Sequence, residues 1–311
     1  MEIDQRNAGA ASSGALNGYW LDRWYSYTSG GGVFTVQQST TVPPGFINSV
    51  VLTVTTADAS IAAGDYYAHT QMIEGVNLAD LDWGKSTAKT ITVSFWARSS
   101  VAGTYGVSVE NSAGDRSYPA PYTISATNTW TYVTVTIPGD TTGTWLTTTG
   151  IGMYLKFDLG SGSTRQGTAN AWNAGNIWTP TGSTQWIATN AATFYLTGMQ
   201  LEIGSTATPF EKRHYGQELA LCQRYYYQMT HPNYWFYPIG GGMSFRRVDY
   251  RWPVPMRAAP TVTGTRATVG TFSGSWTVAG ATVISAEIYG DVTTDSGIYS
   301  YMMSIQASAE L

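Results

Sequence analysis

The sequence predicts an all-β protein, in which a jelly-roll-like β-sandwich is followed by one helix and a second, smaller β-sandwich. Three observations predict this class. Short runs of alternating apolar and polar residues recur along the chain, and Gly, Pro, Asn or Ser bound each run. Charged residues make up only 12% of the 311 residues, whereas ordinary globular proteins have roughly 25%. Aromatic residues reach 14%, which argues against disorder.

We expect four segments along the chain. The first 18 residues are small and polar, as in an extended arm or a first edge strand. One apolar stripe with steps of three and four indicates a helix, and it consists of Leu219, Cys222, Tyr226 and Met229. The predicted segments are an arm over 1–18, a jelly-roll-like module over 19–208, a linking helix over 209–230 and a C-terminal β-sandwich over 231–311.

The strands of the first module are predicted from period-two alternation, because a strand with one buried face alternates apolar and polar residues. The run TITVSFWA, for example, places Ile91, Val93 and Phe95 on one face. The predicted strands cover 35–39, 49–55, 66–75, 90–97, 104–110, 131–137 and 151–159. Their regular spacing is typical of a sandwich or jelly roll, and no repeat of the kind that builds a β-helix is present.

The last strand of this module, over 193–203, changes parity along its length. Phe194 and Leu196 share one face, and Met199 and Leu201 share a face of opposite parity. Such a switch needs one extra residue, so we expect a β-bulge at Gly198.

Beyond the helix the alternation returns. Val248, Tyr250 and Trp252 alternate with charged residues, and the runs TVISAEIYG and GIYSYMMSIQAS have the composition of strands. A stretch of this length predicts a small second sandwich.

We expect no enzyme. The three histidines, His69, His214 and His231, stand in no nucleophile motif, and the carboxylates are scattered. The net charge of −4 and the lack of a basic run argue against nucleic acid. No apolar stretch reaches the roughly 20 residues that span a bilayer, which argues against membrane insertion. The first residues do not have the pattern of a secretory signal.

One structural calcium site is a candidate. Asp80 and Asp82 offer carboxylate oxygens at short spacing before Gly84, but the pattern does not match an EF-hand. The alternative is a turn rich in Asp and Asn. We expect no other cofactor.

Saccharide binding is a candidate function, because sugars stack their C–H faces on aromatic rings and bond their hydroxyls to polar side chains. Two groups supply such residues. The first lies in the unpatterned segment 160–190 and consists of Trp172, Trp178 and Trp186 with Asn173 and Asn176; the second is Tyr234, Trp235 and Tyr237. The alternative is that these rings fill cores or subunit interfaces.

Self-association is a further candidate role for the helix. Its apolar stripe covers one sandwich or lies at a threefold axis, and the stripe alone does not distinguish these. The interface candidates are Leu219, Cys222, Tyr225 and Tyr226. Because Cys222 is the only cysteine, the chain has no internal disulfide, and we expect this side chain to be a buried small hydrophobe.

Several motifs carry a resemblance. TGMQLEIG, ATPFEKR and ELALCQRYYY follow one another over 197–227, IDQRN stands near the start, and PMRAAP opens the last part. This pattern resembles tailed-phage virion proteins, mostly fibres, spikes and other appendages, over most of the chain and most specifically over 199–226. The resemblance implies a structural protein of the phage particle surface, made in the host cytoplasm, often a homotrimer and often concerned with host attachment. It carries over no catalytic residue.

We therefore expect a virion appendage, a fibre or spike, that binds a glycan of the host surface alongside other virion proteins. Two alternatives stay open: a capsid-decorating or head-fibre protein bound to the shell, and a stand-alone carbohydrate-binding module. Similar proteins have an Asn-Gly-Asp run before the Ile-Asp-Gln-Arg segment, whereas this sequence begins at Met1-Glu2. Either an anchor was removed or attachment uses another route.

Overall fold

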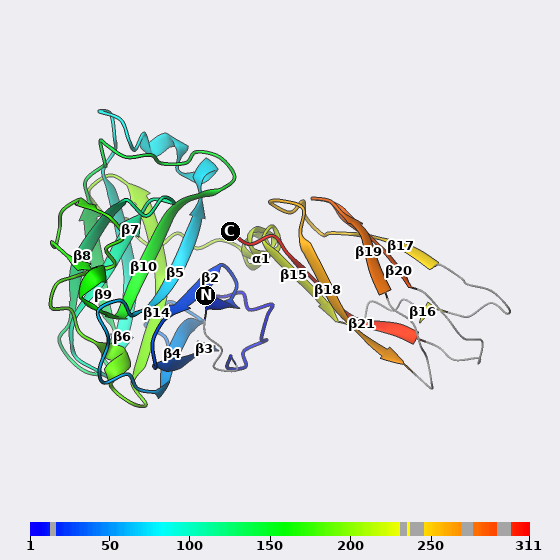
Figure 1. Cartoon of the computed structure of the whole chain (residues 1–311), viewed down its shortest axis with the longest axis horizontal. Coiled ribbons are helices and arrows are strands. Elements are labelled where there is room, and N and C mark those ends of the chain that lie inside the picture. The colour runs from blue at the N-terminus through cyan, green and yellow to red at the C-terminus, as the bar shows by residue number, and fades with distance from the viewer. Residues whose placement is uncertain (13–16, 231–234, 237–245, 269–275, 291–299) are drawn as a thin grey trace. The chain divides into compact units, whose positions relative to one another are not determined.

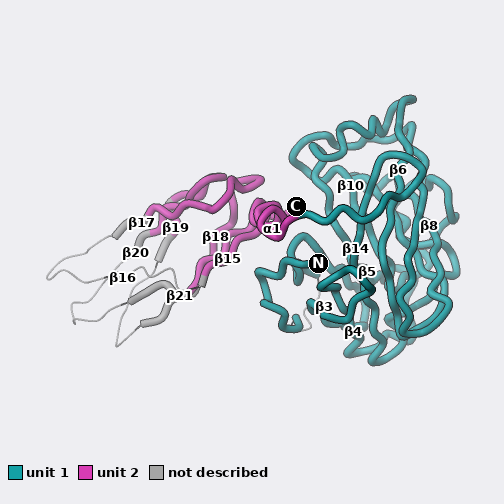
Figure 2. Tube along the Cα trace, turned by 180° about the vertical axis from the view of Figure 1, so that it is seen from behind, with its two compact units in different colours: residues 1–213, 311 teal, residues 214–310 magenta. Residues whose placement is uncertain are grey.

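The fold comes from a computed structural model, which describes residues 1–12, 17–230, 235–236, 246–268, 276–290 and 300–311. The chain forms two compact units, coloured separately in Figure 2: residues 1–213 together with Leu311, and residues 214–310. The described residues contain one α-helix. Their strands pair in antiparallel fashion, except for one parallel pair of two-residue strands. The all-β class with one helix is therefore confirmed.

The first unit consists of two facing sheets (Figure 1). The seven-stranded sheet has the order β1-β2-β5-β10-β7-β8-β12, with bounds Gly18–Leu21, Trp24–Thr28, Tyr66–Glu74, Ile151–Ser161, Gly103–Glu110, Arg116–Ile124 and Asn173–Ala174. The five-stranded sheet has the order β3-β4-β14-β6-β9, with bounds Val33–Ser39, Ser49–Thr56, Thr193–Ile203, Ile91–Ser99 and Thr131–Ile137.

Shorter elements fill the connections of this unit. The 3-10 helices are η1 Gly75–Asn77, η2 Ala79–Leu81, η3 Ser163–Arg165 and η4 Trp186–Ala188, and the strands β11 Gln166–Gly167 and β13 Thr179–Pro180 pair with each other. The chain passes repeatedly from one large sheet to the other, as in a jelly roll.

The core of the first unit lies between the two sheets. Phe95 of β6 meets Phe157 of β10 with ring centroids 4.9 Å apart, and Tyr105 of β7 meets Phe194 of β14 at 5.7 Å. Side chains from both inner faces therefore interdigitate, as in other β-sandwiches. The seven predicted runs and the 193–203 strand coincide with strands of this sandwich.

The structure adds β1, β2 and β8, which the alternation did not predict. β8 contains Pro119 and Pro121, and proline is a signal against a strand because it donates no ladder hydrogen bond. It is tolerated here because the partner on that side, β12, pairs only with Arg116 and Ser117. Both prolines therefore lie on an edge of the sheet.

The predicted β-bulge in β14 is confirmed. The pairing of β14 with β6 shifts register between Thr197 and Gln200, and Gly198 has a φ of +60°. A Cβ atom on Gly198 would lie 2.6 Å from the ring of Phe46. The position therefore needs glycine for its backbone angle and for space.

The described part of the predicted arm is packed onto the first unit. Ile3 and Ser12 are buried, and Ser12 exchanges two hydrogen bonds with Val36 of β3, at 2.8 and 2.9 Å. Residues 5–9 form turns and residues 1–12 contain no strand, whereas Gly18 at the end of the predicted arm begins β1.

The second unit holds α1, Tyr215–Gln223, and two small sheets. In one, β21 (Ser300–Ser308) pairs with β15 (Tyr226–Thr230), β16 (Trp235–Phe236) and β18 (Thr261–Thr268). The other has the order β17-β20-β19, with bounds Arg246–Arg251, Ser285–Gly290 and Trp276–Ala281. Both sheets contribute side chains to one buried hydrophobic cluster, which includes Tyr250, Ile288 and Ile305.

The predicted linking helix over 209–230 is wrong at both ends. The helix has nine residues, Tyr215–Gln223, and Tyr226 lies in β15, where it pairs with Ser308 of β21. The run of three tyrosines explains the change, because aromatic residues favour strands when a partner edge is available. The steps of three and four that predicted a longer helix are therefore coincidental beyond Gln223.

Candidate functional site

The structure separates the three tryptophans of the first predicted glycan group. Trp186 is wholly buried (0% exposed) in the sandwich core, with its ring centroid 5.9 Å from that of Phe34 and 6.4 Å from that of Phe194. No face of this ring is open to a sugar. The prediction that Trp186 belongs to a surface patch is therefore wrong, and the core alternative holds for it.

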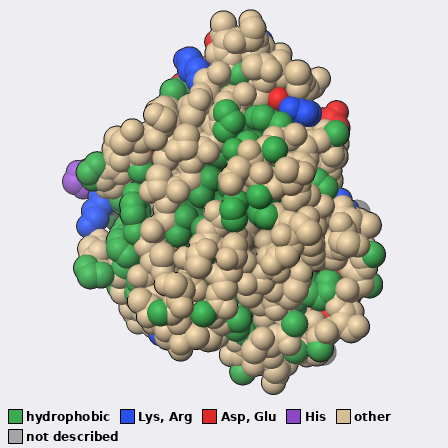
Figure 3. All heavy atoms as spheres, turned by 90° about the vertical axis from the view of Figure 1, so that its left-hand side faces the viewer, with side chains coloured by type: hydrophobic (Ala, Val, Ile, Leu, Met, Phe, Trp, Pro, Cys, Tyr) green, Lys and Arg blue, Asp and Glu red, His purple; other side chains and the backbone are tan. Residues whose placement is uncertain are grey.

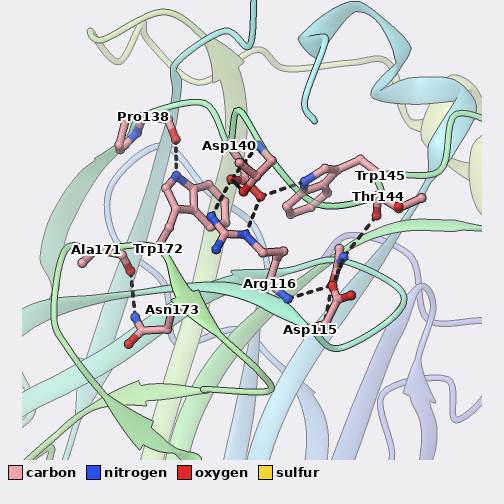
Figure 4. Close-up of polar contacts among 11 residues, drawn as sticks. Asp115, Arg116, Pro138, Asp140, Thr144, Trp145, Ala171, Trp172 and Asn173 are labelled. Atoms are coloured by element: carbon pink, nitrogen blue, oxygen red, sulfur yellow. Dashed lines mark hydrogen bonds and ion pairs between the residues drawn. The ribbon is translucent and has the colours of Figure 1, made fainter. Parts of the chain in front are cut away.

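Trp172 lies half-buried in a cluster of rings. Its centroid is 5.4 Å from Trp83, 5.8 Å from Trp145 and 5.3 Å from Tyr118, with the planes steeply inclined. Its Nε1 donates to the carbonyl of Pro138 at 3.0 Å (Figure 4). Neighbouring rings and the carbonyl thus occupy much of this side chain.

Asp140 holds this cluster together, as Figure 4 shows. Its carboxylate accepts two hydrogen bonds from Arg116, at 2.6 and 2.9 Å, and one from Trp145 Nε1 at 3.1 Å. Burial opposes ionisation of Asp140, but these hydrogen bonds outweigh it and lower its pKa. Asn173 bonds the carbonyls of Thr168 and Ala171 in its own loop. We interpret this region as the anchor of two loops.

Trp178 belongs to a different place, the outer face of the seven-stranded sheet. It is 3% exposed, and its centroid lies 4.5 Å from that of Tyr66 and 5.5 Å from that of Tyr27. The side-chain oxygen of Asn176 accepts a hydrogen bond from the indole Nε1. Trp178 is too buried to be an open platform, but it supports one.

That platform is a row of four tyrosines, which we call the tyrosine ladder: Tyr19 of β1, Tyr25 and Tyr27 of β2, and Tyr66 of β5. Successive ring centroids are 5.0, 4.5 and 6.5 Å apart. All four side chains are half-buried and point away from the core, because their chain neighbours Trp24 and Tyr67 point into it.

Three hydroxyl groups of the ladder are available for a ligand. In the described part of the chain, the hydroxyls of Tyr25, Tyr27 and Tyr66 form no hydrogen bond and are not among the buried unsatisfied polar atoms. Burial raises the pKa of Tyr25 and Tyr27, so both are neutral at physiological pH. Each hydroxyl can therefore both donate and accept.

A buried ion pair lies beside the ladder. Lys156 of β10 donates to Glu110 of β7 at 2.6 Å, and both side chains are 3% exposed. Burial lowers the pKa of Lys156 to about 8 and raises that of Glu110. The ammonium also lies 4.2 Å from the ring centroid of Trp178, a cation–π contact.

The loop over 162–184 packs onto the same outer face next to the ladder. A Cβ atom on Gly106 of β7 would lie 2.1 Å from Thr179 Oγ1, so the loop contacts the sheet backbone directly. The backbone N–H of Trp178 donates to the carbonyl of Arg165 at 2.8 Å. The tyrosine ladder is therefore bounded on one side by an ordered loop.

The second predicted glycan group lies mostly outside the described residues. Tyr234 and Tyr237 lie outside the described residues. Trp235 lies in β16, where its backbone pairs with Tyr301. The second group stays a prediction.

The calcium prediction gains no support. Asp80 is exposed, and Asp82 forms a salt bridge with Lys85 at 2.7 Å. Within the described ranges, no three His, Cys, Asp or Glu side chains gather in a way that could hold a metal ion.

Three of the four interface candidates are already buried in the single chain: Cys222, Tyr225 and Tyr226 are 8, 6 and 5% exposed. Their side chains are therefore not the surface that a neighbouring chain would meet first. Leu219 is half-buried, and Leu221 on the same helix is 42% exposed.

Among the helices that the structure describes, none is long and apolar enough to cross a membrane.

The low share of charged residues is visible on the surface. On the face shown in Figure 3, charged side chains are few and lie near the margins, whereas hydrophobic and uncharged groups fill the middle.

Comparisons with known proteins give distant structural similarities only. No protein-family model matches the chain, and no curated protein matches it. The enzymatically active domain of bacteriophage CBA120 tailspike protein 4 is 15% identical over 58% of this chain and 19% of that one, with a TM-score of 0.34. The chain thus spans about a fifth of that domain's length.

Two carbohydrate-binding modules are matched over nearly their whole length. A family 4 module is 15% identical over 58% of this chain and 95% of its own, with a TM-score of 0.32. The CBM22-1 xylan-binding domain of Xyn10C from Paenibacillus barcinonensis is 12% identical over 65% and 99%, with a TM-score of 0.30. These TM-scores are low, so the function proposed for this chain rests on its own residues.

Proposed function

We propose that the first unit binds a saccharide chain along the tyrosine ladder, and that the protein is a virion appendage of a tailed phage that attaches to a host-surface glycan. One observation carries the binding proposal. Four half-buried tyrosines form a continuous row of rings on an open sheet face, and three of their hydroxyls have no partner within the described residues.

The chemistry of the row fits a saccharide. Sugar rings have apolar C–H faces that pack on aromatic rings, and each phenol hydroxyl can bond a sugar hydroxyl. Binding sites for small ligands combine such apolar surfaces with a few placed polar groups. A row of rings across three strands suits an extended chain of sugars better than a single small molecule.

The virion role rests on the sequence resemblance of 199–226 to phage appendage proteins, and the homotrimer is proposed on the same ground. Presentation of three weak sites on one particle would raise the overall affinity through avidity. A capsid-decorating protein is the alternative of a different class. It would bind the shell through another surface and would not need the ladder.

The binding proposal is tested with Tyr25→Ala and a matched control, Tyr132→Ala. Tyr132 lies in β9 on the outer face of the opposite sheet and is 46% exposed. The assay is binding of the labelled full chain to arrayed oligosaccharides, followed by titration calorimetry on those that bind. We expect Tyr25→Ala to weaken binding about 10-fold, the effect of losing one stacked ring of about 1.4 kcal/mol.

Tyr132→Ala should leave the affinity within about twofold of the unmodified chain. Equal losses in both variants would indicate that binding does not use the ladder. Absence of binding to every saccharide would contradict the glycan-binding role itself.

A further inference from the structure

A guanidinium without a counter-ion lies at one end of the tyrosine ladder. Arg165 of η3 is half-buried, and its guanidinium carbon is 5.3 Å from the ring centroid of Tyr66 and 5.6 Å from that of Trp178. In the part of the chain that the structure describes, Arg165 forms no salt bridge. Two aromatic rings thus hold a full positive charge beside the proposed binding surface.

The hydrogen bonding of Arg165 is also incomplete. Its Nη1 donates to the carbonyl of Asn176 at 3.4 Å, which is long for such a bond. Its Nε is buried and has no partner among the described residues. A buried donor without a partner calls for an acceptor, such as a water molecule or an anion.

Neither of two buried carboxylates of the first unit, Glu110 and Asp158, forms a salt bridge with Arg165. Glu110 is already paired with Lys156 at 2.6 Å. Asp158 of β10 is wholly buried and accepts a hydrogen bond from Ser161, and burial raises its pKa to about 7, so near neutral pH a large share of it is uncharged. Lys156 and Arg165 thus both lie beside Trp178, and only Lys156 has a carboxylate in a salt bridge among the described residues.

The opposite end of the ladder also has a guanidinium. The carbon of the Arg6 guanidinium is 5.4 Å from the ring centroid of Tyr19. The row of rings therefore runs between two arginines.

We infer that the tyrosine ladder binds an acidic glycan, whose anionic substituent, a carboxylate or a phosphate, is bound by Arg165. This inference rests on the proposed saccharide binding. Arginine binds both groups through parallel charge-assisted hydrogen bonds. The contacts of Arg165 with the rings of Tyr66 and Trp178 fix the orientation of its planar guanidinium before a ligand binds. An anion at this position would supply the charge and the acceptor that Arg165 lacks.

The test uses one array with three classes of oligosaccharide. Neutral oligomers of galactose and glucose form the first class, oligogalacturonate and α2,8-linked oligosialic acid the second, and glycerol phosphate oligomers bearing sugars the third. The proteins are the full chain, Arg165→Gln and Arg165→Lys. The matched control is Arg98→Gln, because Arg98 stacks at 4.7 Å on Tyr195 of the opposite sheet.

We expect the unmodified chain to bind one acidic class at least 10-fold more tightly than the neutral oligomers. Arg165→Gln should reduce that affinity about 10- to 100-fold, as expected for a lost charge-assisted hydrogen bond, and Arg165→Lys should retain part of it. Arg98→Gln should have no effect. Circular dichroism melting of each variant verifies that it is folded.

The remaining outcomes separate the two proposals. Binding confined to neutral oligomers, or acidic binding that Arg165→Gln leaves unchanged, overturns this inference and leaves saccharide binding in place. Absence of binding to all three classes contradicts the proposed function and the inference with it. Whether the carboxylate or the phosphate class binds identifies the anion.

Discussion

Two buried titratable groups in the first unit should give the stability of the protein opposing dependences on pH. His69 of β5 and Asp158 of β10 are both 0% exposed. Burial lowers the pKa of His69 from 6.5 to about 3 and raises that of Asp158 from 3.8 to about 7. In both cases the folded state favours the neutral form, because the charged form loses its hydration.

The signs follow from which state binds more protons. For His69, the unfolded chain binds more protons between about pH 3 and 6.5, so acidification from pH 8 to 5 lowers the free energy of unfolding by about 2 kcal/mol. For Asp158, the folded chain binds more protons between 3.8 and about 7, so the same acidification raises that free energy by about 2 to 3 kcal/mol. In the unmodified protein the two contributions oppose each other.

Replacement of His69 by Phe removes one contribution and keeps a ring in place. The imidazole is stacked on Trp24 with centroids 4.9 Å apart and an interplanar angle of 9°, and it shares a hydrogen bond of 3.1 Å with Ser26. Loss of that bond costs about 1 kcal/mol at every pH. Relative to the unmodified protein, the variant should gain about 2 kcal/mol between pH 8 and 5.

The measurement is urea unfolding at pH 8, 7, 6 and 5, with the free energy of unfolding extrapolated to water at each pH. Asp158→Asn is the control, because it removes the opposite contribution. Relative to the unmodified protein, it should lose about 2 to 3 kcal/mol over the same interval. Parallel pH profiles for the unmodified protein and His69→Phe would refute the reasoning, since they would mean that His69 titrates alike in the folded and unfolded chains.

Two further predictions concern the bulge and self-association. Gly198→Ala should lower the free energy of unfolding by about 2 to 3 kcal/mol. The left-handed backbone costs about 1 to 2 kcal/mol, and the new methyl group displaces Phe46. The control is Gly204→Ala, because Gly204 also has a positive φ but no atom lies within 4 Å of its added Cβ, so this variant measures the backbone cost alone. Urea unfolding of both variants checks this, and equal losses would contradict the steric part. Light scattering of the purified chain should give the mass of three chains, and a stable monomer would contradict the homotrimer.

Most strands of the first unit were predictable because apolar residues on one face alternate with more polar residues on the other. Val133, Val135 and Ile137 alternate with exposed residues in β9, and the observed bounds equal the predicted 131–137. The bulge in β14 was predictable for the same reason, since a change of parity requires an extra residue.

The errors have a common cause. Tyr226 and Met229 continued a helical spacing, but an edge of β21 was available to pair with them, and this contact decides between helix and strand. A partner more than 70 residues away in sequence leaves no trace in local periodicity.

The candidate site shows the same division. The sequence correctly suggested that aromatic residues would form the candidate site. However, the tryptophans that it singled out, Trp172, Trp178 and Trp186, lie in three different places in the structure. The tyrosine ladder was missed although WYSYT carried a signal: Tyr25 and Tyr27 alternate there with residues that are buried in the structure. DYYAHT, which contains Tyr66, has no such alternation, because the four residues that follow Tyr66 are all buried.

The sequence by itself determined the all-β class, the position of most strands and the bulge, because burial of one strand face imposes a period of two on neighbouring residues. Only the tertiary structure decided which aromatic rings fill the core, which anchor loops and which form a row on an open face. Those roles depend on strand order and register, which bring Tyr19, Tyr25 and Tyr66 together from three strands. Pairing between distant strands is set by packing of the whole unit, and no single segment encodes it.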